Sequence, residues 1–175
     1  MKSFISNSTC FLIVFALGCS QDDPTVDEGA NFTGRDITYA LESASDFNIS
    51  GTAVLKERID LSTNIIIKLN RTFQGNAELP VHLHLGDITT DQADVAALLQ
   101  PVNAESGISE TVLTILADES KVTFEDIKQM NACIKIHLSA TGPEKDIILA
   151  AANIGAAVSK NPLGGRLGIG LCKSE

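Results

Sequence analysis

From about Gly34 onward, apolar and polar residues alternate in short runs that are separated by turn residues. Side chains in a β-strand point alternately to opposite faces, so a period of two predicts strands with one buried face. The run Ile65-Ile66-Ile67 is β-branched throughout, which disfavours a helix and suits a central strand. The pattern therefore predicts an all-β domain.

Nine short strands fit this pattern, because turn-forming residues separate the apolar runs. They are expected at Asp36–Leu41, Ser50–Lys56, Ile65–Asn70, Val81–Gly86, Val95–Gln100, Glu110–Ala117, Ala132–Ser139, Ile147–Ile154 and Arg166–Leu171. Residues 91–99 fit a short helix or a strand, and we favour the strand because Pro101 leaves little length for a helix. So many short strands favour a Greek-key β-sandwich.

One short helix is expected at residues 123–130. Thr123 suits the N-cap, and Asp126 stands at the third helical position, where its carboxylate can bond back to the N-cap. The segment has room for one or two turns only.

The N-terminus has the features of an export signal. Lys2 supplies a positive charge, residues 10–16 form an apolar stretch too short to span a bilayer, and Ala16-Leu17-Gly18-Cys19 is a small-residue cleavage site. The segment Ala16-Leu17-Gly18-Cys19 resembles a bacterial lipobox, which implies a signal peptide at 1–18 and a diacylated Cys19. Cleavage without lipid, giving a secreted chain, is the alternative.

Residues 19–33 are expected to be a disordered tether, since they are acidic and lack apolar periodicity. Ser20-Gln21-Asp22-Asp23 resembles the acidic export tag of surface lipoproteins in the Bacteroidetes group. This likeness implies a lipid-anchored protein of the cell envelope, held in the outer membrane and displayed at the surface. The folded domain then covers residues 34–175, a length that suits one domain with a core.

The charge balance argues against nucleic acid as a partner. The chain carries 22 acidic and 13 basic residues, for a formal net charge of −9. Such a surface repels phosphate backbones and anionic lipid.

The histidines are the residues most able to carry chemistry. His82 and His84 lie two apart in one predicted strand, so both point to one face about 6.6 Å apart along it, opposite Val81 and Leu83. His137 lies in a second strand. If the two strands are neighbours, three imidazoles converge on one point.

Three neutral imidazoles with an open position suit copper or zinc, so His82, His84 and His137 are candidate metal ligands. Lys135 is predicted to share the face of His137, and its ammonium disfavours a cation there. The alternative is that the histidines only form hydrogen bonds on a sheet face.

Two cysteines remain once Cys10 leaves with the signal and Cys19 takes the lipid. In an oxidising compartment, a disulfide between Cys133 and Cys172 is the favoured interpretation. Two separate thiols, or a thiolate that helps to bind a metal, are the alternatives.

The domain resembles the CHRD domain of bacterial envelope lipoproteins over most of residues 34–155. The segments that carry the likeness are residues 34–41, 49–58, Val81-His82-Leu83-His84, residues 98–102, residues 107–111, residues 134–140 and Ala152-Asn153-Ile154-Gly155. Bacterial members of this family mostly lack an assigned activity, so the resemblance implies fold and location more than function.

A weaker likeness is to the copper–zinc superoxide dismutases, which share an immunoglobulin-like Greek-key sandwich. His82-Leu83-His84 resembles their paired copper histidines, Ile136-His137-Leu138 the strand with a third, and Gly164-Gly165-Arg166-Leu167 the segment with an anion-guiding arginine. The chain has only three histidines, so a full bimetallic centre cannot form.

We therefore expect a lipid-anchored envelope protein with one CHRD-type β-sandwich that acts as a binding or structural module for a protein or glycan. The alternative is a copper-dependent, dismutase-like enzyme with Arg166 as anion guide. The sequence has no Gly-x-Ser-x-Gly, phosphate-loop or Cys-x-x-Cys motif.

Overall fold

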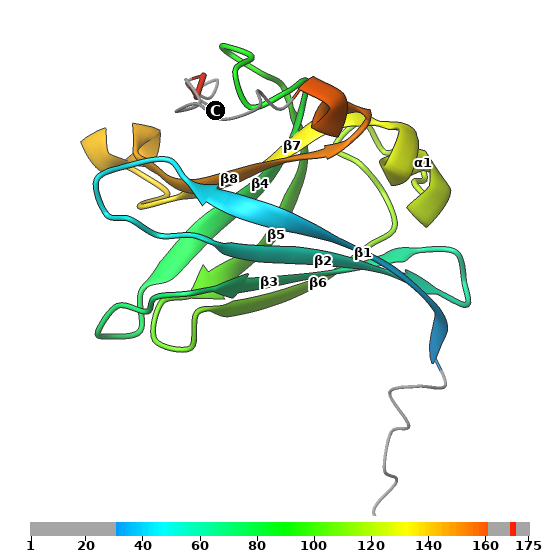
Figure 1. Ribbon diagram of the computed structural model, residues 1–175, viewed down its shortest axis with the longest axis horizontal. Helices are drawn as coiled ribbons and strands as arrows, with labels where there is room; N and C mark the ends of the chain where they lie inside the picture. The colour runs from blue at the N-terminus through cyan, green and yellow to red at the C-terminus, as the bar shows by residue number, and fades with distance from the viewer. Residues whose placement is uncertain (1–30, 161–168, 171–175) are drawn as a thin grey trace, which may run out of the picture.

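Alternating side chains build a closed antiparallel barrel in the computed structural model, which describes residues 31–160 and 169–170 (Figure 1). The strands are β1 (Phe32–Ser43), β2 (Gly51–Arg58), β3 (Thr63–Leu69), β4 (Glu78–Leu85), β5 (Val95–Asn103), β6 (Ile108–Leu113), β7 (Asn131–His137) and β8 (Ile148–Gly155). Between β6 and β7 lies helix α1 (Phe124–Gln129), and short 3-10 helices η2 (Pro143–Asp146) and η3 (Ala156–Lys160) flank β8. The all-β prediction with one short α-helix is confirmed for this part of the chain.

The strands follow each other around the barrel in the order β1-β2-β3-β6-β5-β4-β7-β8. Strand β7 lies beside β4 and not beside β6, so strands β4 to β7 form a Greek key. This connection is what brings the two histidine-bearing strands together.

The barrel has two short seams. Between β5 and β6 the ladder pairs Asn103 with Ile108, and Pro101 has no N–H to extend it. The amide of Gln100 instead donates to Oγ1 of Thr111, at 2.8 Å. Between β1 and β8 the ladder is confined to Glu42 with Ala151 and Ser43 with Ala150.

The core fills the barrel with aliphatic side chains from every strand. Leu55, Ile65, Leu83, Ile134 and Ile154 are among the fully buried members. Burying each such side chain contributes about 1.5–3 kcal/mol, so the interior carries most of the stability.

Helix α1 begins as predicted. Thr123 is the N-cap, its side chain accepts from the backbone N–H of Asp126, and the Asp126 carboxylate accepts from the backbone N–H of Thr123. Both halves of the capping box are therefore present. Arg35 of β1 ties the helix to the barrel through ion pairs with Glu57 and Glu125.

Part of the outer surface is covered as well. Ile88, from the loop after β4, packs on Cys133, Ile148 and Ala151, and Ile169 lies against this cluster. Consequently β7 and β8 are buried on both faces, apart from their ends.

The predicted ninth strand, Arg166–Leu171, falls mostly on residues outside the described part, and Ile169 and Gly170 belong to no strand. No helix among the described residues has the length and apolar character needed to cross a membrane.

Candidate metal centre

Strand β4 positions two of the histidines by simple alternation. Val81 and Leu83 are buried in the core, at 1% and 0% exposure, while His82 and His84 point to the outer face. Leu85 shares the face of Val81 and Leu83 by the same alternation, but it is 45% exposed because it is the last residue of the strand.

Strand β7 brings the third histidine to the same face. The antiparallel register pairs His82 with Lys135 and His84 with Cys133, so His137 lies two residues beyond Lys135. Ile134 and Ile136 fill the alternate positions and are fully buried in the core. The pairing of the two strands was the condition for convergence, and it is met.

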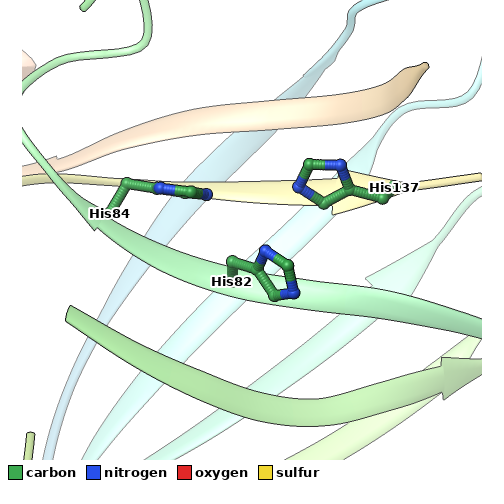
Figure 2. Close-up of side chains that lie close together, drawn as sticks. All are labelled: His82, His84 and His137. Atoms are coloured by element: carbon green, nitrogen blue, oxygen red, sulfur yellow. The ribbon is translucent and has the colours of Figure 1, made fainter. Parts of the chain in front are cut away.

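The three imidazoles lie together outside the barrel (Figure 2). Ring centroids are 5.6 Å apart for His82 and His84, 4.7 Å for His82 and His137, and 6.3 Å for His84 and His137. One nitrogen from each ring lies within 4.8 Å of the other two. The predicted convergence is therefore present, and metal binding itself stays a prediction.

His84 is held by the loop that follows its strand. The ring is fully buried, and its Nδ1 lies 3.1 Å from the carbonyl oxygen of Ala93. The pKa of His84 is lowered from 6.5 to about 4, chiefly by burial; the hydrogen bond to Ala93 opposes this shift, and the charge of Lys135 adds to it. The imidazole is therefore neutral at physiological pH.

His137 is held in the same way from the other side. It is 3% exposed, and its Nδ1 lies 2.8 Å from the carbonyl oxygen of Lys145, in η2. Two loops, one after β4 and one after β7, thus orient one ring each.

These two hydrogen bonds settle where the ring protons are. A carbonyl oxygen can only accept, so Nδ1 of His84 and of His137 must donate. In the neutral ring Nε2 then keeps its lone pair. Such a carbonyl partner is the usual support of a metal-binding histidine, because it fixes both the tautomer and the ring orientation.

The spacing of the nitrogens fits a metal after a small movement. A tetrahedral ion with nitrogen ligands at 2.0–2.1 Å needs them about 3.4 Å apart. The largest separation here is 4.8 Å, so the nitrogens have to approach each other by up to about 1.4 Å to reach one ion. His82 is half-buried, whereas the other two rings are buried, so solvent reaches the group from its side.

Lys135 is the feature that opposes a cation. Its side chain is fully buried, and Nζ donates to the carbonyl oxygen of Gly170 at 2.7 Å. The amide of Gly170 in turn donates to the carbonyl oxygen of Ile88 at 2.8 Å. The Lys135 ammonium thus holds Gly170 on the covered face, and its charge lowers the pKa of His84.

The remaining predicted residues are not brought into the group. Cys133 is buried opposite His84, in the apolar cluster with Ile88, and is not one of the candidate ligands. Its predicted disulfide partner Cys172, the anion guide Arg166 and the lipid-bearing Cys19 all lie outside the described residues.

Sequence reasoning missed the backbone groups that support the site. The carbonyls of Ala93 and Lys145 have no sequence signature, since any residue supplies one. Asn153 is a second omission: it is buried on β8, and its Oδ1 accepts from the backbone N–H of Ile88 at 2.7 Å. A buried asparagine in an alanine-rich strand was the available signal for that contact.

Comparison of the chain with protein-family models, with curated proteins and with solved structures found no match.

Proposed function

We propose that the protein is a lipid-anchored envelope protein whose β-domain binds one copper or zinc ion through His82, His84 and His137. The observation that carries this proposal is that three imidazole nitrogens lie within 4.8 Å of one another. They come from β4 and β7, which the Greek key makes neighbours in the sheet. Hydrogen bonding of two of these rings to backbone carbonyls supports it.

Copper and zinc are the preferred ions because all three candidate ligands are imidazoles. Calcium and magnesium favour carboxylate and carbonyl oxygens, whereas imidazole nitrogen suits copper and zinc. Three protein ligands leave at least one coordination position for water or another ligand, which enters from the half-buried side of His82.

For the fold, we propose a flattened barrel of the Greek-key sandwich type, in keeping with the resemblance to CHRD domains. The support is the shortness of the two seams, at Asn103–Ile108 and at Glu42–Ala151, which divide the barrel into two four-stranded layers. For the anchor, we propose diacylated Cys19. Incorporation of labelled palmitate, lost in Cys19→Ser, tests it, and unchanged labelling rejects it.

Metal analysis of protein purified without a histidine tag tests the proposed site. The expected result is one copper or zinc ion per chain after reconstitution, lost in the double variant His82→Ala and His84→Ala. Thr38→Ala, on the exposed face of β1, is the matched control and should keep the ion. Absence of metal in the reconstituted parent protein rejects the site and leaves a binding or structural module.

A copper-dependent, dismutase-like enzyme is the second candidate. It is favoured by the open coordination position that three histidines leave. A superoxide dismutation assay on the copper-loaded protein separates catalysis from simple metal binding. Activity that disappears in His137→Ala supports the enzyme, and inactive copper-loaded protein rejects it.

A further inference from the structure

The domain uses the same turn twice at one end of the barrel. In the β2–β3 turn, Arg58 N–H donates to Ser62 O and Leu61 N–H to Arg58 O. In the turn after β6, Leu116 N–H donates to Ser120 O and Glu119 N–H to Leu116 O. Each turn therefore closes the same ring of hydrogen bonds.

The polar residues of the two turns also match. Oδ1 of Asp60 accepts from the amide and hydroxyl of Ser62, and Oδ1 of Asp118 accepts from those of Ser120. What the turn needs is thus an aspartate, and a serine two residues later.

The two other positions differ between the turns. Ala117 and Glu119 flank Asp118, whereas Ile59 and Leu61 flank Asp60. Ile59 is 62% exposed and Leu61 57% exposed, so neither side chain is needed for the core. The polar version shows that the turn forms without large aliphatic residues.

Leu61 also occupies an unfavourable backbone conformation. Its φ is +70°, in the left-handed region, where glycine, asparagine and aspartate are usual. A bulky aliphatic residue there costs stability and is exposed to water. Glu119 has a φ of +66° at the matching position, so the turn itself requires this conformation, and what distinguishes the turn at Leu61 is its exposed aliphatic side chain.

The β2–β3 turn lies where the N-terminal segment enters the domain, which suggests what the turn contacts. The N–H of Ile59 donates to Asn31 O at 3.0 Å, and Phe32 pairs with Arg58, so the chain enters the domain at this turn. The 11 residues from 20 to 30 join this point to the proposed lipid at Cys19. Fully extended they span at most about 40 Å, which keeps this end of the domain close to the bilayer.

A third aliphatic side chain lies at the same end. Leu113 pairs with Thr63 at the end of the ladder between β3 and β6, and Ile115 follows two residues later, so it lies beyond β6 at this end of the barrel. Ile115 is 54% exposed. Ile59, Leu61 and Ile115 are named here the entry tip.

We propose that the entry tip inserts into the interfacial region of the bilayer that holds the lipid at Cys19, so that the barrel stands on the membrane by this end. This inference rests on the proposed lipid anchor. The occupant is the lipid surface itself, since the tip is aliphatic and adjoins the tether. Insertion of even one aliphatic side chain shifts the equilibrium toward contact by about tenfold or more.

Tryptophan fluorescence tests the contact, because the chain has no tryptophan of its own. The lipidated full-length Ile59→Trp protein is reconstituted into phosphatidylcholine vesicles with or without brominated acyl chains. Leu98→Trp is the matched control, since Leu98 is also 62% exposed but lies on β5 opposite His82. We expect blue-shifted emission and bromine quenching for Trp at 59, and neither for Trp at 98.

A second variant checks that the neighbouring leucine takes part. Leu61→Glu, added to Ile59→Trp, gives the turn the residue that its polar counterpart has at Glu119, so the turn should still form. Quenching is expected to fall several-fold, with an unchanged thermal unfolding midpoint.

Two results overturn the contact while the anchor survives. In both, the protein sediments with the vesicles and Trp at 59 is not quenched by bromine. Emission at the wavelength of water-exposed tryptophan shows that the tip stays in water, whereas blue-shifted emission indicates contact with a second copy of the chain. Protein that stays in the supernatant overturns the anchor and the entry tip together.

Discussion

The outer face of the barrel is exposed to water on the side of β1 and covered by other segments on the side of β7 and β8. On β1 the outward residues, such as Thr38 and Ala40, are exposed, and the strand alternates between the core and water. On β7 and β8 the outward residues are buried, because the loop after β4 and Ile169 cover them. The covered half therefore encloses a second small interior outside the barrel.

This difference explains why the chemistry is on one side. His84, Lys135, His137 and Asn153 are all buried on the covered half. Their polar side-chain atoms form hydrogen bonds with backbone groups of the covering segments. Examples are the hydrogen bonds of Lys135 with Gly170 and of Asn153 with Ile88. A covering that hydrogen-bonds these groups offsets the cost of burying them.

The largest effect is expected from a matched pair of alanine substitutions. Ala40 and Ala151 both point outward, but Ala40 is exposed and Ala151 is buried beside Lys135. Ala151→Lys should lower the free energy of unfolding by about 3–5 kcal/mol, because it buries a second, unpaired ammonium. Ala40→Lys should change it by less than about 0.5 kcal/mol. Urea denaturation measures both, and equal effects would remove the distinction between the halves.

The pH dependence of the metal-free protein should show the burial of His84. Its folded pKa is about 4 and its unfolded pKa about 6.5, so the unfolded chain binds more protons between these values. Stability is therefore fully present above pH 6.5 and falls by up to about 3 kcal/mol as the pH drops to 4. The difference between the parent protein and His84→Gln isolates this contribution. Parallel stability curves for the two would show that His84 is not protected from water.

A smaller effect is expected from the buried lysine. Lys135→Met keeps the length of the side chain and removes a positive charge beside the three histidines. The affinity for copper or zinc should rise about tenfold, or about 1.4 kcal/mol, because the ion no longer meets a like charge. Competition with a chelating dye measures the affinity. Weaker binding in the variant would mean that Lys135 supports the site and does not oppose it.

The sequence predicted much of the local structure. Eight of the nine predicted strands and the capping box of Thr123 and Asp126 correspond to described elements, with shifted ends. The largest shifts are of four residues: β1 begins at Phe32 and not at Asp36, and β6, which was expected to end at Ala117, ends at Leu113. The chain turns after β6 because the amide and hydroxyl of Ser120 form hydrogen bonds with the carboxylate of Asp118. Hydrophobic periodicity does not detect such a local hydrogen-bonding preference.

Closure of the barrel lay beyond sequence reasoning. It depends on pairings between distant strands, such as Glu42 with Ala151, that no local pattern encodes. Alternation placed His82 and His84 on one face, yet the partner strand of β4 had to be assumed. The carbonyls of Ala93 and Lys145 could not be foreseen, because they are supplied by loop geometry and not by residue type.

X-ray absorption at the metal edge tests the central claim most directly, since it counts the ligands of the ion. Protein loaded with one equivalent of zinc or copper is predicted to show three imidazole nitrogens at about 2.0–2.1 Å. This shell should lose one imidazole in each of His82→Ala, His84→Ala and His137→Ala. A shell of oxygen with one imidazole or none in the parent protein would contradict the three-histidine centre.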